Sequence, residues 1–361
     1  MKYLFILISI FFMSGTIIGS QTSKILVVSS YESGFEWTDR QNEGIQNTFD
    51  SSDLSLQVKN VFLDIKTVYD KNNYLSLHKK LLEIKSLNFK PDIIICNDAE
   101  ALKFISEIKE ELFAESQLVF SGFSDDVNLM SGGINRFSGN FIRDGLKKNL
   151  ELAIKLFPNA KNLAFVHDQT DEGKMYAAAT DNAIVKFSDR NFFFLTNLNI
   201  SRLKDAIEKL PSNTIVFLLN FNYDANNDYY DDDKACEIIA KHSKKPVFGL
   251  KSTFLGHGII GGYLINPFNL GKLSAQTALE IIKGREVNPL NTIPDSAFKL
   301  TFDEDYLKKA DIERSSLPAG SMIINSSYSK NNLNLYITGS LLILLTAALL
   351  GAYFILRRKN K

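Results

Sequence analysis

The sequence is poor in the residues that build metal centres and disulfide frameworks. Its 361 residues include two cysteines, Cys96 and Cys236, and four histidines. Two cysteines are too few for a disulfide framework or a multi-cysteine metal site, and the histidines are dispersed, without an HExxH motif. We therefore expect no metal and no cofactor. We also expect both thiols to be buried, although a disulfide between them stays open as an alternative if the chain is exported.

Catalytic and nucleotide-binding signatures are also missing. The chain has no GxSxG nucleophile elbow, which leaves a serine hydrolase unsupported. The run GHGIIG at 256–261 matches GxGxxG, but a strand-like apolar run follows it where the dinucleotide motif needs a helix. The acidic stretch 224–233 fails as an EF-hand loop, because Tyr229 and Ala235 stand where Gly and Glu are required. We expect that stretch to be a solvated loop, and we expect the chain not to be an enzyme.

The charge balance does not favour a nucleic-acid partner. The chain carries 41 basic and 41 acidic residues. Without Lys2 and the four cations of residues 357–361, 36 basic residues face 41 acidic ones, a net charge of −5. Phosphate binding needs a clustered basic surface, so this balance excludes nucleic acid as a main partner. At roughly 150 residues per domain, the length predicts about two domains.

Residues 1–20 have the features of a secretory signal peptide. One charge, Lys2, precedes an apolar run at 3–13, and small residues follow near Gly19 and Ser20. This order is typical of a cleaved export signal. An uncleaved N-terminal anchor is the alternative. No cysteine follows the apolar run, which excludes a lipoprotein anchor.

Residues 335–356 have the features of a transmembrane helix. These 22 residues carry no charge, and as a helix they would span about 33 Å, enough to cross a bilayer. Tyr336 and Tyr353 lie near the ends, where amphipathic rings prefer the membrane interface. The basic tail 357–361 is expected to stay cytoplasmic. The sequence thus predicts a single-pass cell-membrane protein with an extracytoplasmic body.

The body alternates short apolar runs with stretches of helical spacing. Unbroken apolar runs such as IIIC at 93–96 are typical of strands covered on both faces, as in parallel sheets. Strands are expected at 24–30, 56–62, 92–96, 117–122, 162–167, 192–197, 214–220, 245–250 and 258–265. Helices are expected at 38–49, 72–87, 98–111, 144–157, 171–187, 201–210, 231–242 and 270–283.

This alternation runs through the body twice. It predicts an α/β fold of two doubly wound lobes that face each other across a ligand cleft, plus the C-terminal transmembrane helix. The expected N-terminal lobe is 24–135, with part of 250–300 returning to it, and the expected C-terminal lobe is 136–250. Residues 301–332 are expected to form a juxtamembrane connector. The Ser and Asn content near its end predicts a solvated segment.

Ligands of such sheets bind beyond the carboxyl ends of the strands. Nine residues at or near these ends are expected to bind the ligand: Ser30, Tyr31, Trp37, Asp98, Ser121, Asp168, Asn220, Asn222 and His257. Trp37 is the only Trp, and it either stacks on the ligand or packs its loop onto the lobe. Asp98 either caps a helix or contacts the ligand.

Seven segments in order resemble a known family. They are SYESGFEWTDRQNEGI, VFLDIKTVYDKNNYL, PDIIICNDAEALKFI, LVFSGFSD, VHDQTDEGK, PVFGLKSTFLGHGIIGGYLI and FDEDYLKKADIERSSLPAGSMIIN. Together they resemble the ABC transporter substrate-binding protein family, which has the type 1 periplasmic-binding fold. The resemblance spans residues 24–358 and is strongest to the extracytoplasmic sensor region of membrane histidine kinases and diguanylate cyclases. It implies reversible binding of a small molecule between lobes that close by hinge motion.

Two functions follow from this resemblance. The first is a membrane-tethered sensor or receptor subunit for a small molecule, with an amino acid or another small planar solute as the ligand class. Five residues follow the predicted membrane helix, so its signal would pass through a histidine kinase or cyclase partner. The alternative is the substrate-binding component of an ABC importer that delivers a small solute to a permease.

Overall fold

The computed structural model describes most of the body of the chain. The described residues are 22–65, 80, 83–85, 88–123, 137–142, 145–285, 290–292 and 297–325. The predicted signal peptide, the predicted membrane helix, the basic tail and most of the helix expected at 72–87 lie outside this part. Within it, no helix is long and apolar enough to cross a bilayer.

A six-stranded sheet forms the first lobe. Its strands are β1 (Ser23–Ser29), β2 (Leu56–Phe62), β3 (Ile93–Asn97), β4 (Gln117–Phe123), β5 (Phe137–Ile142) and β11 (Leu290–Thr292), in the order β11-β5-β4-β3-β1-β2. All neighbours pair in parallel. Successive side chains of β3 enter different cores, because Ile94 and Cys96 pack on one face and Ile93 and Ile95 on the other. The apolar run therefore follows from burial on both faces.

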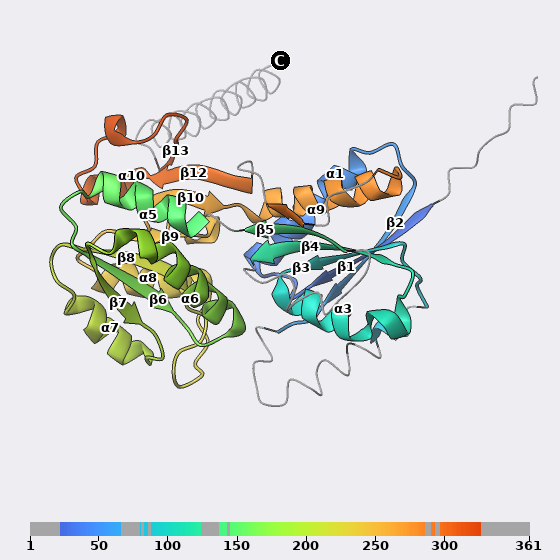
Figure 1. Cartoon of the computed structure of the whole chain (residues 1–361), viewed down its shortest axis with the longest axis horizontal. Coiled ribbons are helices and arrows are strands. Elements are labelled where there is room, and N and C mark those ends of the chain that lie inside the picture. The colour runs from blue at the N-terminus through green and yellow to red at the C-terminus, as the bar shows by residue number, and fades with distance from the viewer. Residues whose placement is uncertain are drawn as a thin grey trace, which may run out of the picture.

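Three helices of the described part of the chain cover this sheet (Figure 1). Helix α3 (Ala99–Leu112) lies on one face, and α1 (Glu36–Asp50) and α9 (Pro267–Ile282) lie together on the other. Gly44 of α1 and Gly271 of α9 allow this approach, since an added Cβ at either would collide with a backbone carbonyl of the other helix. The chain thus returns to the first lobe after building the second.

A four-stranded parallel sheet forms the centre of the second lobe. Its strands are β6 (Asn162–His167), β7 (Asn191–Leu195), β8 (Thr214–Asn220) and β9 (Val247–Gly249), in the order β7-β6-β8-β9. A row of stacked rings, Phe165, Phe217 and Phe248, lies on one face. Helices α5 (Gly145–Leu156) and α6 (Asp171–Ile184) pack on that face, and α7 (Ile200–Glu208) and α8 (Asp232–His242) pack on the other.

A small third sheet completes the second lobe. Strands β10 (Gly261–Ile265) and β12 (Phe298–Asp303) pair antiparallel, and β13 (Met322–Ile324) pairs in parallel with β12. Helix α10 (Glu304–Lys309) follows β12. Figure 1 shows this sheet beside α5 and β9, along the edge of the second lobe.

The structure corrects two of the expected boundaries. Residues 301–325 are not a separate connector, because Phe302 and Leu307 are buried in the core of the second lobe. The second lobe does not begin at 136, because β5 pairs with β4 of the first sheet. By contrast, the strands predicted at 56–62, 162–167 and 214–220 have the observed bounds. The α/β class with parallel sheets is confirmed.

Candidate functional site

The carboxyl ends of β1 and β3 carry aromatic and acidic side chains that meet the second lobe. Tyr31 lies two residues after β1, Trp37 lies in the first turn of α1, and Asp98 directly follows β3. Tyr31 and Trp37 are buried in the same apolar cluster as Leu219 and Leu250 of the second lobe. The predicted strand-end positions are therefore at the contact between the two lobes.

Asp98 turns its side chain toward α1. The Trp37 indole Nε1 donates a 3.0 Å hydrogen bond to Asp98 Oδ2, and Gln41 Nε2 lies 3.5 Å from Oδ1. Although Asp98 is the N-cap residue of α3, its side chain makes no capping hydrogen bond within the described chain. Its φ of 70° is in the left-handed region that non-glycine residues seldom adopt. Such backbone geometry is enriched at functional sites.

Lys251, two residues after the end of β9, supplies a buried cation. Its Nζ lies 2.9 Å from Glu172 Oε1, 2.7 Å from Asn220 Oδ1 and 4.0 Å from Asp232 Oδ2. The ammonium also lies 5.8 Å from the ring centroid of Trp37 and 5.9 Å from that of Tyr176. Charged and aromatic partners both stabilise a cation in this setting.

A hydrogen bond connects the two lobes directly. The Tyr31 hydroxyl donates to Glu172 Oε2 at 3.2 Å, while the other oxygen of Glu172 pairs with Lys251. Asn220 continues the chain of polar contacts, since its amide donates to Asp168 at 3.1 Å. A connected polar network thus runs from the first lobe into the sheet end of the second.

Burial and neighbouring charges shift the pKa values of the ionisable groups in this network. Burial and the nearby Glu172 raise the pKa of Asp98 to about 7, although the Trp37 hydrogen bond and Lys251 act in the opposite direction. Burial and Glu172 also raise the pKa of Tyr31 well above its ordinary value. Burial alone would lower the pKa of Lys251, but the carboxylates of Asp232 and Glu172 outweigh it and raise that pKa. These shifts have the causes expected for buried, interacting charges.

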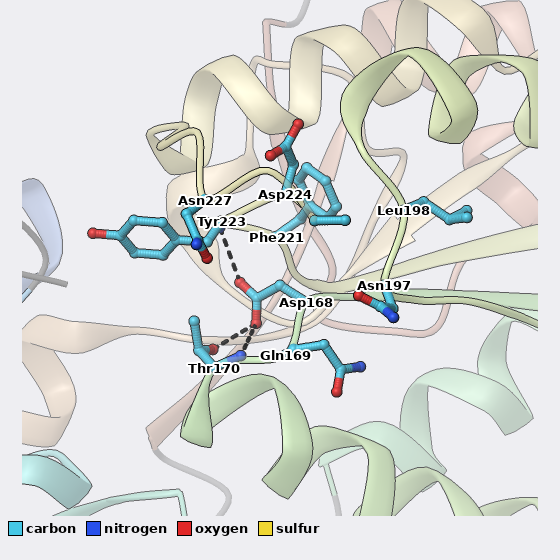
Figure 2. Close-up of a pocket in the computed structure, with 10 residues that line it drawn as sticks. Asp168, Gln169, Thr170, Asn197, Leu198, Phe221, Tyr223, Asp224 and Asn227 are labelled. Atoms are coloured by element: carbon cyan, nitrogen blue, oxygen red, sulfur yellow. Dashed lines mark hydrogen bonds between the residues drawn. The ribbon is translucent and has the colours of Figure 1, made fainter. Parts of the chain in front are cut away.

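The carboxylate of Asp168, directly after β6, accepts hydrogen bonds from two neighbouring loops. Its Oδ1 accepts from the Thr170 N–H and hydroxyl, and its Oδ2 accepts from Asn220, from the Asn222 N–H at 2.7 Å and from the Tyr223 N–H. Figure 2 shows the carboxylate between Thr170 and Tyr223, at a cavity of about 130 Å³. This geometry fixes the loop after β8 to the loop after β6.

The remaining predicted residues are placed as follows. Ser30 Oγ donates to Asn97 O and accepts from Ala101 N–H, which ties β1 to α3. Ser121 is fully buried, with its hydroxyl 3.5 Å from Leu270 O. Asn222 donates to Asp232 Oδ1 at 2.9 Å. All three side chains make internal contacts, and Ser121 also lies beside Asp98, whose N–H donates to the Ser121 carbonyl at 3.0 Å.

His257 lines a larger cavity between the lobes, which Asp232 of the Lys251 cluster also lines. This cavity of about 420 Å³ is bounded by the loop before α1 and by the start of α8; its lining residues are Glu32, Ser33, Gly34, Phe35, Glu36, Asp231, Asp232, Asp233, Thr253 and His257. The His257 ring faces Glu237 at 3.2 Å. The acidic stretch is only partly solvated, because Asp224 and Asp232 are buried and hydrogen-bonded.

Sequence reasoning missed the charged centre of the site. Glu172 lies in the first turn of α6, and Lys251 lies two residues after β9. Both lie at the strand ends that the fold makes available to a ligand, and both stand in segments that resemble the family, VHDQTDEGK and PVFGLKSTF. A lysine directly after the predicted strand 245–250 is the signal that was available. Within the described residues, no group of His, Cys, Asp and Glu could hold a metal ion, and Cys96 and Cys236 are buried free thiols.

Comparison with known families decides what kind of protein carries this site. A family model described as ABC transporter substrate binding protein matches residues 132–316, which is 185 of the 361 residues. The chain belongs to the ABC transporter substrate binding protein family. This confirms the family resemblance of the sequence, while comparison with curated proteins gives no match.

Solved structures share the fold of this substrate binding protein. A conserved domain protein from Vibrio cholerae has a TM-score of 0.61 at 15% identity, covering 84% of this chain and 99% of that one. The ligand-free, open form of a substrate binding protein with adhesive properties from Clostridium difficile has a TM-score of 0.60 at 16% identity, covering 84% and 100%. An ABC domain from Streptococcus pneumoniae in complex with L-Trp has a TM-score of 0.61 at 12% identity, covering 84% and 100%. At these identities the likeness shows the fold alone.

Proposed function

We propose that this chain is the extracytoplasmic substrate-binding component of an ABC importer, which holds a small solute between its lobes and delivers it to a permease. The observation that carries the proposal is the buried network between the lobes. Tyr31, Trp37 and Asp98 of the first lobe meet Glu172, Tyr176 and Lys251 of the second. Such a site forms when the lobes close and opens when they separate, as reversible binding requires.

The family assignment favours import over the sensor function that we expected first. The matching family is described by transport, and the similar Clostridium difficile and Streptococcus pneumoniae structures are named for substrate binding and for an ABC domain. The kinase or cyclase partner of a sensor has no comparable support. We therefore place the permease first among proposed partners, and a single membrane helix remains the predicted tether.

The site also favours binding over catalysis. Its groups are engaged with one another, as Trp37 with Asp98 and Lys251 with Glu172 show, and an aromatic face beside charged groups is typical of solute recognition. The ligand-binding residues that we propose are Tyr31, Trp37 and Asp98, together with Glu172, Tyr176 and Lys251. The other residues predicted to contact the ligand remain proposed contacts around this group: Ser30, Ser121, Asp168, Asn220, Asn222 and His257.

A binding screen followed by an uptake assay tests the proposal. The full chain in nanodiscs is screened by thermal shift against amino acids, nucleosides and small sugars, because a bound ligand stabilises the folded state. Uptake of the strongest binder at low concentration is then measured in cells with and without the gene. We expect deletion to abolish this uptake and the wild-type gene to restore it. Unchanged uptake, with purification of the chain in complex with a kinase or cyclase, would favour the sensor function instead.

A further inference from the structure

Carboxylates outnumber cations where the two lobes meet. Asp98 of the first lobe and Glu172 and Asp232 of the second are linked by short contacts to Trp37, Tyr31 and Lys251. Three carboxylates against one ammonium leave a net charge of −2 when all are ionised. Across the contact between the lobes, the negative charge of Glu172 raises the pKa of Asp98, as expected for two like charges that repel each other. Closing the lobes without a ligand therefore brings negative charges together.

Lys251 does not offer its charge to a ligand. Glu172, Asn220 and Asp232 surround its ammonium within 4.0 Å, and the Trp37, Tyr176 and Phe254 rings complete the enclosure at 5.8 to 5.9 Å. An ammonium has three donors. With these partners in place, an anionic ligand would have to displace one of them.

A buried acceptor beside Asp98 is independent evidence of a missing donor. Gln41 is fully buried, and its amide nitrogen Nε2 lies 3.5 Å from Oδ1 of Asp98. Its Oε1 has no hydrogen-bond partner within the described residues. A buried acceptor without a donor costs free energy, so a ligand that brings a donor to this position is favoured.

We infer that the ligand carries a protonated amine, and that this ammonium binds between Asp98 and Glu172 with Gln41 Oε1 as a further acceptor. The inference rests on the proposed function. An ammonium supplies the donor that Gln41 Oε1 lacks, adds donors for the two carboxylates and offsets the excess negative charge. The Tyr31 to Glu172 hydrogen bond opens as the lobes separate and gives access to this site.

Probes of defined charge test the inference. Tryptamine, putrescine and agmatine carry an amine without a carboxylate; indole-3-propionate and glutarate carry only a carboxylate; glucose and uridine are neutral. Each is titrated into the full chain in nanodiscs, and binding is measured by thermal shift and calorimetry. We expect binding to be confined to the amines. Preferential binding of the carboxylates or of the neutral probes overturns the inference and leaves the proposed function intact. Absence of binding by every class counts against both.

Matched substitutions locate the ammonium. Asp98→Asn keeps an acceptor for Trp37 but removes the charge, and Glu172→Gln makes the same change on the other lobe. Each is expected to weaken binding of the best amine by about tenfold or more. Asp181→Asn, an exposed position on α6, is the control and is expected to leave binding unchanged. Equal affinity in folded Asp98→Asn and Glu172→Gln proteins would place the amine elsewhere and overturn the inference.

Discussion

The indole nitrogen of Trp37 donates a 3.0 Å hydrogen bond to the carboxylate of Asp98, and both side chains are buried. This pair joins the first turn of α1 to the end of β3 and holds an acid group at the contact between the lobes. It also shows that the two readings of Trp37, packing and ligand contact, are compatible. The same side chain packs in the core and presents a ring to Lys251.

Substitution of Trp37 separates these two roles. Trp37→Ala is expected to lower ligand affinity by on the order of 2 kcal/mol or more, because a desolvated aromatic anchor is lost. It is also expected to destabilise the fold by about 3–5 kcal/mol, because Trp37 is buried. Trp37→Phe keeps an aromatic face, so it should retain most of the affinity. Calorimetry with the strongest ligand of the screen checks both, and unchanged affinity in folded Trp37→Ala protein would defeat the assignment.

The ionisation of Asp98 predicts a specific pH dependence of stability. Burial, Glu172 and Glu100 raise its pKa from 3.8 to about 7, against the lowering effects of the Trp37 hydrogen bond and Lys251. The folded protein therefore holds this proton more tightly than the unfolded chain does. The resulting stabilisation is full below pH 3.8 and is lost as the pH rises to about 7.

Asp98→Asn removes this titration. We expect the variant to unfold at a higher temperature than the wild type at about pH 8, where Asp98 is ionised, and the difference to be smaller at about pH 5, where only part of the stabilisation is lost. Thermal unfolding of both proteins at the two pH values measures the difference. A variant that is equally destabilised at both values would show that the Asp98 charge is not the cause.

The hydrogen bond between Tyr31 and Glu172 predicts a role in closure. Tyr31→Phe removes the hydroxyl that joins the lobes, so the equilibrium should shift toward separated lobes by about 1 kcal/mol. The shift is measured from spin-label distances after Glu107→Cys on α3 and Asp205→Cys on α7, two exposed positions. The native cysteines are buried.

Tyr229→Phe is the matched control for this experiment. Its hydroxyl donates to Asp231 within the second lobe at 2.8 Å, so the substitution removes a hydroxyl without breaking the Tyr31 contact. We expect the control to keep the wild-type distance distribution. The same distribution in Tyr31→Phe as in the wild type would mean that this bond does not stabilise closure.

The sequence also predicts how the chain is oriented in the membrane. The basic tail 357–361 follows the uncharged stretch 335–356, and positively charged flanks stay cytoplasmic. Proteinase added to intact spheroplasts should therefore digest the body and leave a C-terminal tag protected. A protected body would contradict the importer and the sensor functions alike.

The regular part of the fold could be read from the sequence because its strands are buried on both faces. The run TIVFLLN at 214–220 is apolar throughout, and it forms β8 with the predicted bounds. Strand β12 was missed although its residues FKLTFD alternate between apolar and polar, as in a half-buried strand, because residues from 301 onward were expected to form a connector. Its burial depends on pairing with β10 and β13, which are distant in the sequence. The local pattern of apolar residues does not indicate which distant strands will pair with it.

The site was predicted in part for a related reason. Tyr31, Trp37 and Asp98 follow apolar strands, so topology alone places them at the contact between the lobes. Glu172 and Lys251 are charged residues that normally lie at the surface. Lys251 is buried and Glu172 is partly buried here because each has the other as a partner, and two residues 79 positions apart in the sequence give no local sign of that pairing.

Hydrogen exchange of the full chain, with and without a saturating amount of the strongest ligand, tests most directly whether the ligand binds between the lobes. Binding there should protect residues on both sides of the contact at once. We expect slower exchange in segments 30–41 and 97–101 of the first lobe together with 171–176 and 250–254 of the second, because ordering a site lowers local opening. Protection confined to one lobe, or to the cavity at Asp168 alone, would contradict the account.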